Sequence, residues 1–210
     1  MKHDVALKVA EALVEHLRPA CVRIEIKGSV SRLKPDVKDI EILVVPDLGK
    51  VLRAPLVFGQ PVPRLYATKL DQVLDEMVKD GAIRLDADGS RMKKLYLKYA
   101  GIAVDLFICI PPSDWGVSAV IRTGPADFSH WCVTHKSKGG ALPDGYFVKH
   151  QVVWIESEIS KQEVGENPDK AIAVWAEDGN HLAMPEEVDF LKFLGLGWME
   201  PKERVARWTR

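Results

Sequence analysis

Two acidic residues that alternate along one predicted β-strand have the types and spacing that suggest chemistry. Asp39 and Glu41 begin the apolar run at residues 39–45, and alternate residues of a strand project from the same face. Two adjacent carboxylates at the start of a buried strand repel each other and lose hydration. A divalent cation would offset that cost, so the pair predicts a metal site. An exposed strand edge with ordinary surface acids is the alternative interpretation.

A third acidic residue interrupts another apolar strand. Asp105 is the one charged residue in the run 102–110, and a lone charge there is costly unless it is paired or bound to a metal. One interpretation is a salt bridge to a lysine or arginine of a neighbouring strand. The other is that this strand lies beside strand 39–45, so that Asp105 completes a three-carboxylate cluster. Such ligands suit Mg²⁺ or Mn²⁺, and two of these ions commonly serve nucleotidyl transfer.

The segment that precedes the acidic strand contains residues that suit a phosphate group. Gly28 and Ser29 end the alternating strand 21–27, and Arg32 follows them. The backbone N–H groups of a Gly-Ser turn and a guanidinium are good donors to phosphate oxygens. The alternatives are an ordinary turn residue at Ser29 and a solvated charge at Arg32.

Hydrophobic periodicity predicts the elements that would position these residues. Before Pro111-Pro112 the patterns predict helices at 3–17 and 68–79, strands at 21–27, 39–45 and 102–110, and a hairpin at 83–99. Beyond this point they predict helices at 125–137 and 185–194 and strands at 146–148 and 152–155. We therefore predict an α/β (α+β) protein. Residues 1–111 would form a catalytic domain with a mixed sheet and two helices behind it, and residues 112–210 a smaller α+β subdomain.

Charge and composition narrow the partners and the setting. Residues 1–140 carry 21 basic and 17 acidic side chains, whereas residues 141–200 carry 4 and 12, so a polyanion should prefer the first two thirds. The three cysteines form no C-x-x-C pair and no metal-ligand spacing. We find no signal peptide and no apolar run long enough to span a membrane. We therefore expect a cytoplasmic protein, with a nucleoid or a viral replication site as the alternatives.

Taken together, these residues resemble the nucleotidyltransferase superfamily, and more closely the polymerase β-like family X DNA polymerases. The superfamily signature of Gly-Ser, Arg, Asp-x-Asp/Glu and a distant strand Asp is matched by residues 28–29, 32, 39–41 and 105. Residues 113–124 resemble the stretch that leads to the Tyr-Phe-Thr-Gly motif of family X, and the tail at 185–204 resembles its C-terminal ending. The resemblance covers nearly the whole chain. It implies a nucleotidyltransferase palm at 1–111 and a thumb-like nucleotide- and DNA-binding subdomain at 112–210.

The resemblance also implies a role for each matching residue. The residues that would be catalytic and would ligate two Mg²⁺ ions, with Mn²⁺ as a substitute, are Asp39, Glu41 and Asp105. The residues that would bind the triphosphate and the sugar of the incoming nucleotide are Gly28, Ser29, Arg32, Thr123 and Gly124. The lysines that would contact the DNA backbone, with a solvated face as the alternative, are Lys93, Lys94, Lys136 and Lys138. Two departures stand out, because Glu41 replaces an Asp and Ile121-Arg122 replace the Tyr-Phe pair that packs on the sugar.

The resemblance implies metal-dependent transfer of a nucleotide from a (d)NTP to a primer 3′-hydroxyl, with release of pyrophosphate. We expect a small gap-filling repair DNA polymerase that acts as a monomer on a DNA primer-template or on gapped DNA. One alternative is a nucleotidyltransferase that ignores a template or uses an RNA end, a protein or a small molecule as acceptor. The basic loop at 136–140 and the polymerase-like tail argue against a small acceptor. The other alternative is a catalytically idle nucleic-acid-binding module.

Overall fold

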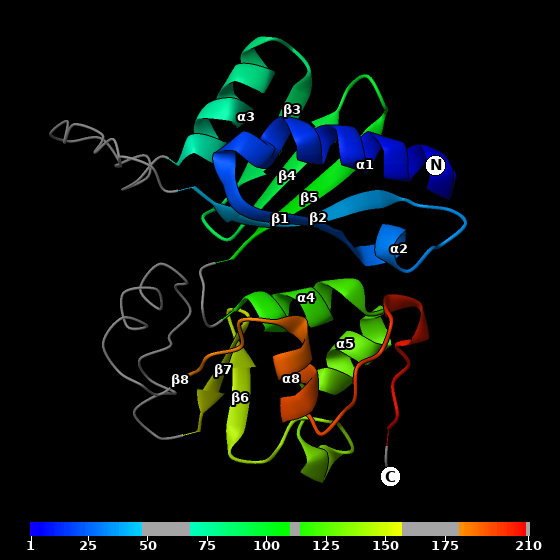
Figure 1. The fold of residues 1–210 in the computed structure, drawn as a ribbon, viewed down its shortest axis with the longest axis vertical. Helices are drawn as coiled ribbons and strands as arrows, with labels where there is room; N and C mark the ends of the chain where they lie inside the picture. The colour runs from blue at the N-terminus through cyan, green and yellow to red at the C-terminus, as the bar shows by residue number, and fades with distance from the viewer. Residues whose placement is uncertain (48–67, 110–113, 157–180, 209–210) are drawn as a thin grey trace, which may run out of the picture. The chain divides into compact units, whose positions relative to one another are not determined.

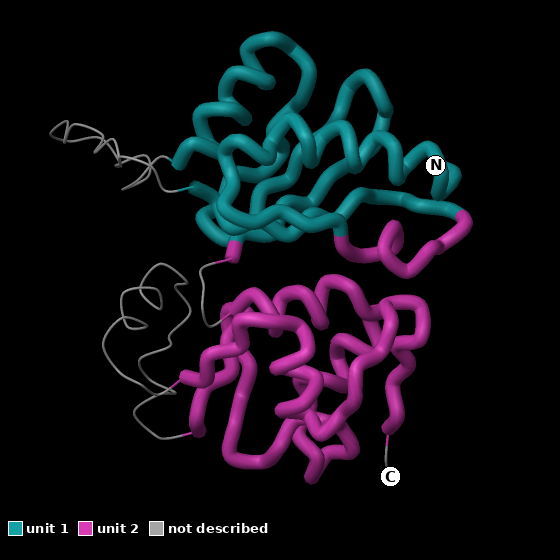
Figure 2. Tube along the Cα trace, viewed as in Figure 1, with its two compact units in different colours: residues 1–26, 36–108 teal, residues 27–35, 109–210 magenta. Residues whose placement is uncertain are grey.

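The computed structural model describes residues 1–47, 68–109, 114–156 and 181–208. The chain forms two compact units (Figure 2): unit 1 contains residues 1–26 and 36–108, and unit 2 contains residues 27–35 and 109–210. The predicted domains are continuous segments, whereas the structure assigns residues 27–35 to the same unit as the C-terminal half. The catalytic and DNA-binding labels of the two domains stay a prediction.

Unit 1 is built on a five-stranded mixed sheet with the strand order β1-β2-β5-β4-β3. Its strands are β1 Cys21–Lys27, β2 Asp39–Pro46, β3 Ile83–Asp88, β4 Met92–Leu97 and β5 Ile102–Ile108. Strands β2 and β5 run parallel, whereas β4 is antiparallel to both β5 and β3. The predicted mixed sheet and the predicted hairpin are confirmed, and so is the expectation that β5 lies beside β2.

Two helices lie along one side of this sheet (Figure 1): α1 His3–Leu17 and α3 Lys69–Lys79. Helix α1 is followed by the short 3₁₀ turn η1 Arg18–Ala20, where Pro19 lacks the N–H that a longer helix needs. Helix α3 begins at a capping box. The hydroxyl of Thr68 accepts from the backbone N–H of Asp71 at 3.2 Å, and the Asp71 carboxylate accepts from the Thr68 N–H at 2.7 Å.

Unit 2 combines short helices with a three-stranded sheet. Its helices are α2 Gly28–Ser31, α4 Trp115–Thr123, α5 Ala126–Cys132 and α8 Glu187–Phe193, with 3₁₀ turns η2 Lys136–Lys138 and η3 Pro201–Glu203. Its antiparallel strands are β6 Tyr146–Lys149, β7 Val152–Ile155 and β8 His181–Leu182, in that order. No helix in the described ranges of either unit is long and apolar enough to cross a membrane.

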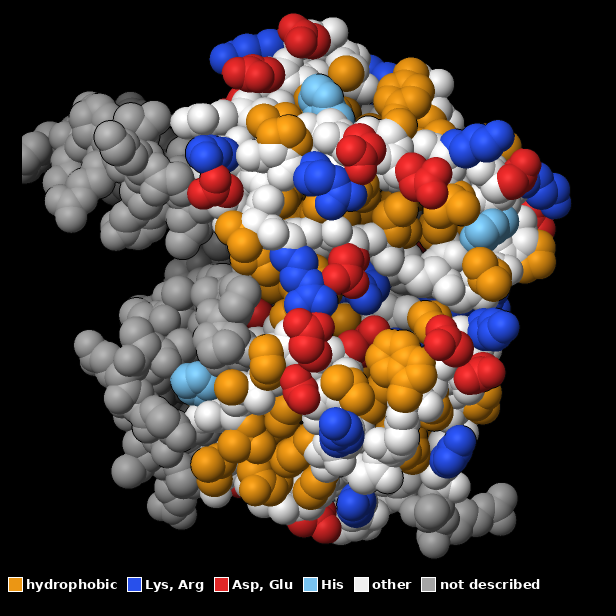
Figure 3. Space-filling view, viewed as in Figure 1, with side chains coloured by type: hydrophobic (Ala, Val, Ile, Leu, Met, Phe, Trp, Pro, Cys, Tyr) orange, Lys and Arg blue, Asp and Glu red, His pale blue; other side chains and the backbone are white. Residues whose placement is uncertain are grey.

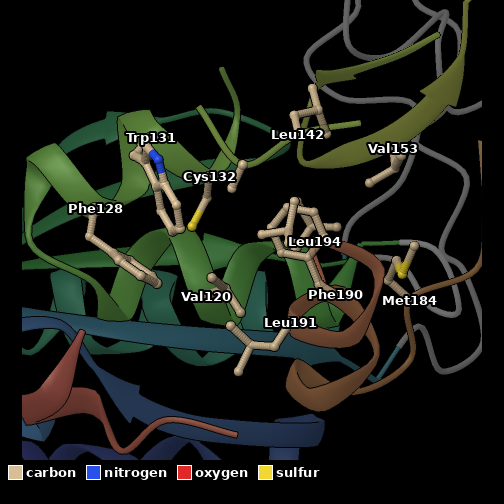
Figure 4. Close-up of a cluster of buried hydrophobic side chains, with 12 residues drawn as sticks. Val120, Phe128, Trp131, Cys132, Leu142, Val153, Met184, Phe190, Leu191 and Leu194 are labelled. Carbon is tan, nitrogen blue, oxygen red and sulfur yellow. The ribbon is translucent and has the colours of Figure 1, made fainter. Parts of the chain in front are cut away.

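One apolar cluster holds unit 2 together. Figure 4 shows side chains of α4, α5 and α8 meeting those of β7 and the loop after α5, including Phe128, Trp131, Leu142, Phe190 and Leu194. Each of these five side chains is at most 5% exposed, and burial of large apolar side chains is the main term that stabilises such a unit.

Helix α5 is shorter than the predicted helix at 125–137, because the chain turns back after Cys132. The N–H of Ala141 donates to the carbonyl of Trp131 at 3.0 Å, and the N–H of Leu142 donates to that of Thr134 at 2.9 Å. These contacts draw Leu142 into the apolar cluster. A Cβ at Gly140 would lie 2.0 Å from the Thr134 carbonyl oxygen, so this return requires glycine.

Candidate active site

The structure places the three predicted catalytic carboxylates on one face of the unit 1 sheet. In the parallel pair β2–β5, Glu41 is the register partner of Asp105, and Asp39 is the partner of Ala103. Register partners project from the same face, as do residues two apart on one strand. Because neighbouring strands lie about 4.8 Å apart, Glu41 and Asp105 are adjacent, and Asp39 follows along the same face. The roles of the three acids as metal ligands stay a prediction.

The opposite face of the same strands is apolar and is covered by helix α3. Ile42, Leu106 and Lys93 are in register across β2, β5 and β4, and the first two are fully buried. The ammonium of Lys93 lies 2.7 Å from the carboxylate of Asp71 in α3. The helix therefore lies over the Lys93 face, and the carboxylate face is the other one.

Lys93 is not placed to contact DNA. Its side chain is 3% exposed, and its Nζ lies 2.7 Å from both Asp71 Oδ1 and Asp88 Oδ1. An ammonium enclosed by two carboxylates has no face left for a phosphate, so Lys93 is withdrawn from the predicted DNA contacts. Strand alternation was the available signal, because Lys93 and Lys94 are consecutive on β4 and must face opposite sides.

Lys94 lies on the carboxylate face, as the register partner of Asp105. Its Nζ is 4.0 Å from Asp105 Oδ1, with side-chain exposures of 53% and 20%. The salt-bridge interpretation of Asp105 is therefore realised in part, by a lysine of the neighbouring strand. Lys94 stays a candidate DNA contact, but its first neighbour is a predicted catalytic acid.

The carboxylates fit a divalent cation by their chemistry but are not drawn together. Within the ranges that the structure describes, no three His, Cys, Asp or Glu side chains are gathered closely enough to hold a metal ion. Three oxygen donors on one face suit Mg²⁺, which prefers carboxylates and water. The backbone register already makes Glu41 and Asp105 neighbours, so side-chain rotation would close the set without any change in strand pairing.

The predicted Gly-Ser turn is a single helical turn, α2, and belongs to unit 2. Gly28 has φ +69°, a left-handed conformation that favours glycine. The backbone N–H of Arg32 donates to the Gly28 carbonyl at 3.1 Å and closes the turn. Ser29 therefore lies within a hydrogen-bonded helical turn, and Arg32 comes directly after it. Neither residue lies on an extended loop.

Arg32 connects the predicted nucleotide-binding residues of unit 2 to one another. Its Nη1 donates to the carbonyl oxygens of Thr123 at 2.6 Å and of Gly124 at 3.0 Å. These two carbonyls belong to the C-terminal end of α4, where the last carbonyls of a helix lack partners within the helix. The guanidinium thus fixes α2 against the end of α4, a contact that the sequence did not predict.

Several donors in this group are buried without a partner in the described part of the chain. They are the hydroxyls of Ser29 and Thr123 and the Nε of Arg32. Buried donors normally find an acceptor, and phosphate oxygens are acceptors of the kind that such donors bind. Gly124 has a packing role, because a Cβ there would lie 2.5 Å from the ring of Phe128.

The other two candidate DNA contacts, besides Lys94, lie in a basic loop. Lys136 and Lys138 are exposed on η2. The Ser137 hydroxyl donates to Asp144 Oδ1 at 2.6 Å, and this bond holds the pKa of Asp144 below its ordinary value. On the face drawn in Figure 3, basic and acidic side chains intermix over unit 1, so the basic surplus of the first two thirds forms no single patch there.

One charged group that the sequence did not single out lies next to the Gly-Ser turn. Glu187, at the start of α8, accepts from Arg204 Nη1 at 2.7 Å, and its other carboxylate oxygen lies 3.7 Å from Lys27 Nζ. The Arg204 side chain is fully buried and also donates to the Met199 carbonyl at 3.2 Å. The sequence of the tail at 185–204 resembles a motif, but nothing local in it predicts that Arg204 is enclosed.

Two of the three cysteines are poor nucleophiles. Burial raises the pKa of Cys21 to about 11 and that of Cys132 to about 12, and Cys109 is buried. Since the thiolate is the reactive form, the thiols of Cys21 and Cys132, which stay protonated near neutral pH, react poorly. Cys21 and Cys132 are therefore not suited to covalent catalysis near neutral pH.

Comparison with known proteins identifies the fold. No protein-family model matches the sequence, and a search of curated proteins finds no match. Among solved structures, polymerase beta of Leishmania infantum in a ternary P/T complex matches with a TM-score of 0.66 at 16% identity, over 98% of this chain and 76% of that chain. The chain has the polymerase β fold.

A second structure of the same protein, a ternary gap complex, supports this assignment. It matches with a TM-score of 0.63 at 15% identity, over 97% of this chain and 70% of that chain. The resemblance to the family X polymerases is thereby confirmed for the fold, in which a mixed sheet carries the acids.

Proposed function

We propose that this protein is a metal-dependent nucleotidyltransferase that adds a nucleotide from a (d)NTP to a primer 3′-hydroxyl, as a small gap-filling DNA polymerase. The observation that carries the proposal is the register of Glu41 with Asp105, which puts them on one sheet face with Asp39. The polymerase β fold supports it, and the solved relatives are complexes named for P/T and gapped substrates.

The residues of the chain would divide the reaction between them. Asp39, Glu41 and Asp105 would hold two Mg²⁺ ions. When bound, such ions neutralise triphosphate charge and favour ionisation of a hydroxyl. The hydroxyl oxygen then forms a bond to the α-phosphorus, the bond from that phosphorus to the bridging oxygen breaks, and pyrophosphate leaves. Asp105, on the strand beside Glu41, would accept the hydroxyl proton.

The unit 2 residues would hold the nucleotide. The unpartnered hydroxyls of Ser29 and Thr123 and the Nε of Arg32 are donors for phosphate or sugar oxygens. Arg32 is already oriented by its two bonds to the end of α4, so little side-chain freedom is lost when a nucleotide binds. Lys136 and Lys138, exposed on a basic loop, would contact the DNA backbone.

Primer extension tests the proposal. Wild-type protein with Mg²⁺ should add a templated nucleotide to a one-nucleotide gap, and Asp105→Asn should reduce the rate by at least about 10³-fold, as expected for loss of metal-held charge stabilisation. Asp36→Asn is the matched control, because Asp36 is an exposed acid paired with Lys2 at 2.8 Å. It should keep wild-type activity.

The outcomes separate the alternatives. Absence of nucleotide addition to any DNA end by wild-type protein would contradict the polymerase proposal. Addition that ignores the template would favour a terminal transferase instead. Equal rates for Asp105→Asn and Asp36→Asn, with unchanged circular dichroism spectra, would mean that the carboxylate face does not carry the chemistry.

A further inference from the structure

The carboxylate face of unit 1 holds a lysine at the same level as its acids. Lys94, Asp105 and Glu41 are consecutive register partners across the neighbouring strands β4, β5 and β2. They form a row of one positive and two negative side chains on one face, and the Lys94 ammonium lies 4.0 Å from the Asp105 carboxylate.

The two lysines of β4 differ in how firmly they are held. Lys93 is enclosed by two carboxylates at 2.7 Å and is 3% exposed. Lys94 contacts its acid at 4.0 Å and is 53% exposed. A loose, exposed ion pair is weak, and the four-carbon stem of lysine lets the ammonium move into solvent. Lys93 is therefore a fixed structural cation, whereas Lys94 can be displaced.

We propose that Lys94 is an exchangeable counter-ion of the carboxylate face, which offsets repulsion between the acids and gives way when a divalent cation binds. The inference rests on the proposed function, because it takes the three acids as metal ligands. Adjacent carboxylates repel each other, and an ammonium beside Asp105 lowers that repulsion. It does not bring the three carboxylates together as metal ligands. A divalent cation carries twice the positive charge of the ammonium and would bind the same acids, but the nearby ammonium repels it. Lys94 thus sets how tightly the metal binds and acts through Asp105 as a positioning residue.

Titration with Mn²⁺ in the absence of nucleotide and DNA tests the exchange. Free Mn²⁺ is followed by electron paramagnetic resonance for the full-length wild type, Lys94→Met, Lys94→Arg and Lys98→Met. Coulomb's law for a unit charge near a divalent ion at a solvated surface predicts about tenfold tighter binding by Lys94→Met at low salt, and the gain should shrink as salt rises. Lys94→Arg should bind like the wild type. Lys98 is exposed just beyond β4 and provides the matched loss of charge, which should leave the affinity unchanged.

A second measurement separates charge exchange from a structural role. Without metal, the melting temperature of Lys94→Met should fall slightly below that of Lys98→Met, and saturating Mn²⁺ should raise it by more than it raises the wild type. Equal Mn²⁺ affinities for Lys94→Met and Lys98→Met, or weaker binding by Lys94→Met, would overturn the inference.

Mn²⁺ binding by Asp105→Asn distinguishes a failure of the counter-ion inference from a failure of the proposed function. If Asp105→Asn abolishes Mn²⁺ binding while Lys94→Met binds like the wild type, the counter-ion inference is wrong and the carboxylate site stands. If the wild type and Asp105→Asn bind Mn²⁺ equally, the carboxylate site itself is wrong, and the proposed function is overturned with the inference.

Discussion

Replacing Lys93 by methionine should destabilise unit 1 by about 2–4 kcal/mol, somewhat below the usual cost of about 3–5 kcal/mol for removing one partner from a buried ion pair. The Lys93 ammonium lies 2.7 Å from Asp71 and 2.7 Å from Asp88, and the side chains of Lys93 and Asp71 are 3% and 7% exposed. Without the lysine, Asp71 stays buried with its bonds to Thr68. These bonds keep the cost near the lower end of the range, because the Asp71 carboxylate still accepts hydrogen bonds when the lysine is absent.

Lys94→Met is the matched control for this prediction. It makes the same substitution at the next residue of β4, where the side chain is 53% exposed and its acid is 4.0 Å away. An exposed pair of this kind contributes less than about 1 kcal/mol. The two variants lose the same charge and the same atoms, so the difference between them reports the burial of Lys93 and its closer ion pairs.

The assay has to distinguish the two units. All six tryptophans lie between residues 115 and 208, so tryptophan fluorescence reports on unit 2, whereas hydrogen exchange of amides in α3 and β4 reports on unit 1. Lys93→Met should increase exchange in α3 and β4 by about 30-fold or more, since each 1.4 kcal/mol changes an opening equilibrium tenfold. The urea midpoint seen by fluorescence gives the internal comparison.

A double-mutant cycle provides the refutation. Asp71→Asn keeps an oxygen for the cap of α3 but removes the buried negative charge. In the Lys93→Met background it should recover about 1 kcal/mol or more. Equal exchange rates for Lys93→Met and Lys94→Met, or a cycle with no coupling, would show that the ion pair of Lys93 with Asp71 does not hold α3 to the sheet.

Two further predictions concern unit 2. Gly124→Ala should destabilise unit 2 by about 1–3 kcal/mol, because its Cβ would lie 2.5 Å from the ring of Phe128. Gly197→Ala, with nothing within 4 Å, should change the fluorescence-detected urea midpoint far less, and equal shifts would contradict the packing argument. The pKa of Asp144 is lowered by its bond from Ser137, so its contribution is present above the ordinary carboxyl pKa and is lost as pH falls through the lowered value. Amide exchange at Ser137 should accelerate over that acidic range in the wild type but not in Asp144→Asn.

Local patterns were sufficient to predict the elements of unit 1. The apolar stripe of helix 3–17, the capping Thr68 and the alternation at 21–27 each depend on residues close in sequence, and the structure has α1, α3 and β1 there. The pairing of β2 with β5 was predicted from chemistry, because a lone acid in an apolar strand needed neighbours. The register of Glu41 with Asp105 agrees with that reasoning.

The features that escaped prediction depend on contacts between distant residues. The type and position of Arg32 predict a phosphate contact, but two carbonyls at the end of α4 also accept hydrogen bonds from it. Helix α5 ends early because the returning segment forms hydrogen bonds with its last turn. No residue within the helix predicts this end. Strand alternation predicts that Lys93 and Lys94 face opposite sides of the sheet. It does not predict the two acids that contact Lys93, because they come from α3 and from β3.

Residues 27–35 belong to unit 2, and this has a consequence for folding during synthesis of the chain. This short segment lies between β1 and β2 in sequence, yet the acceptors of Arg32 come 91 and 92 residues later, and the acid beside Lys27 is at position 187. At translation rates of about 5–20 residues per second, the segment waits on the order of ten seconds for these partners. We therefore expect the Gly28–Ser31 turn to be the last part of the N-terminal half to become ordered on the ribosome.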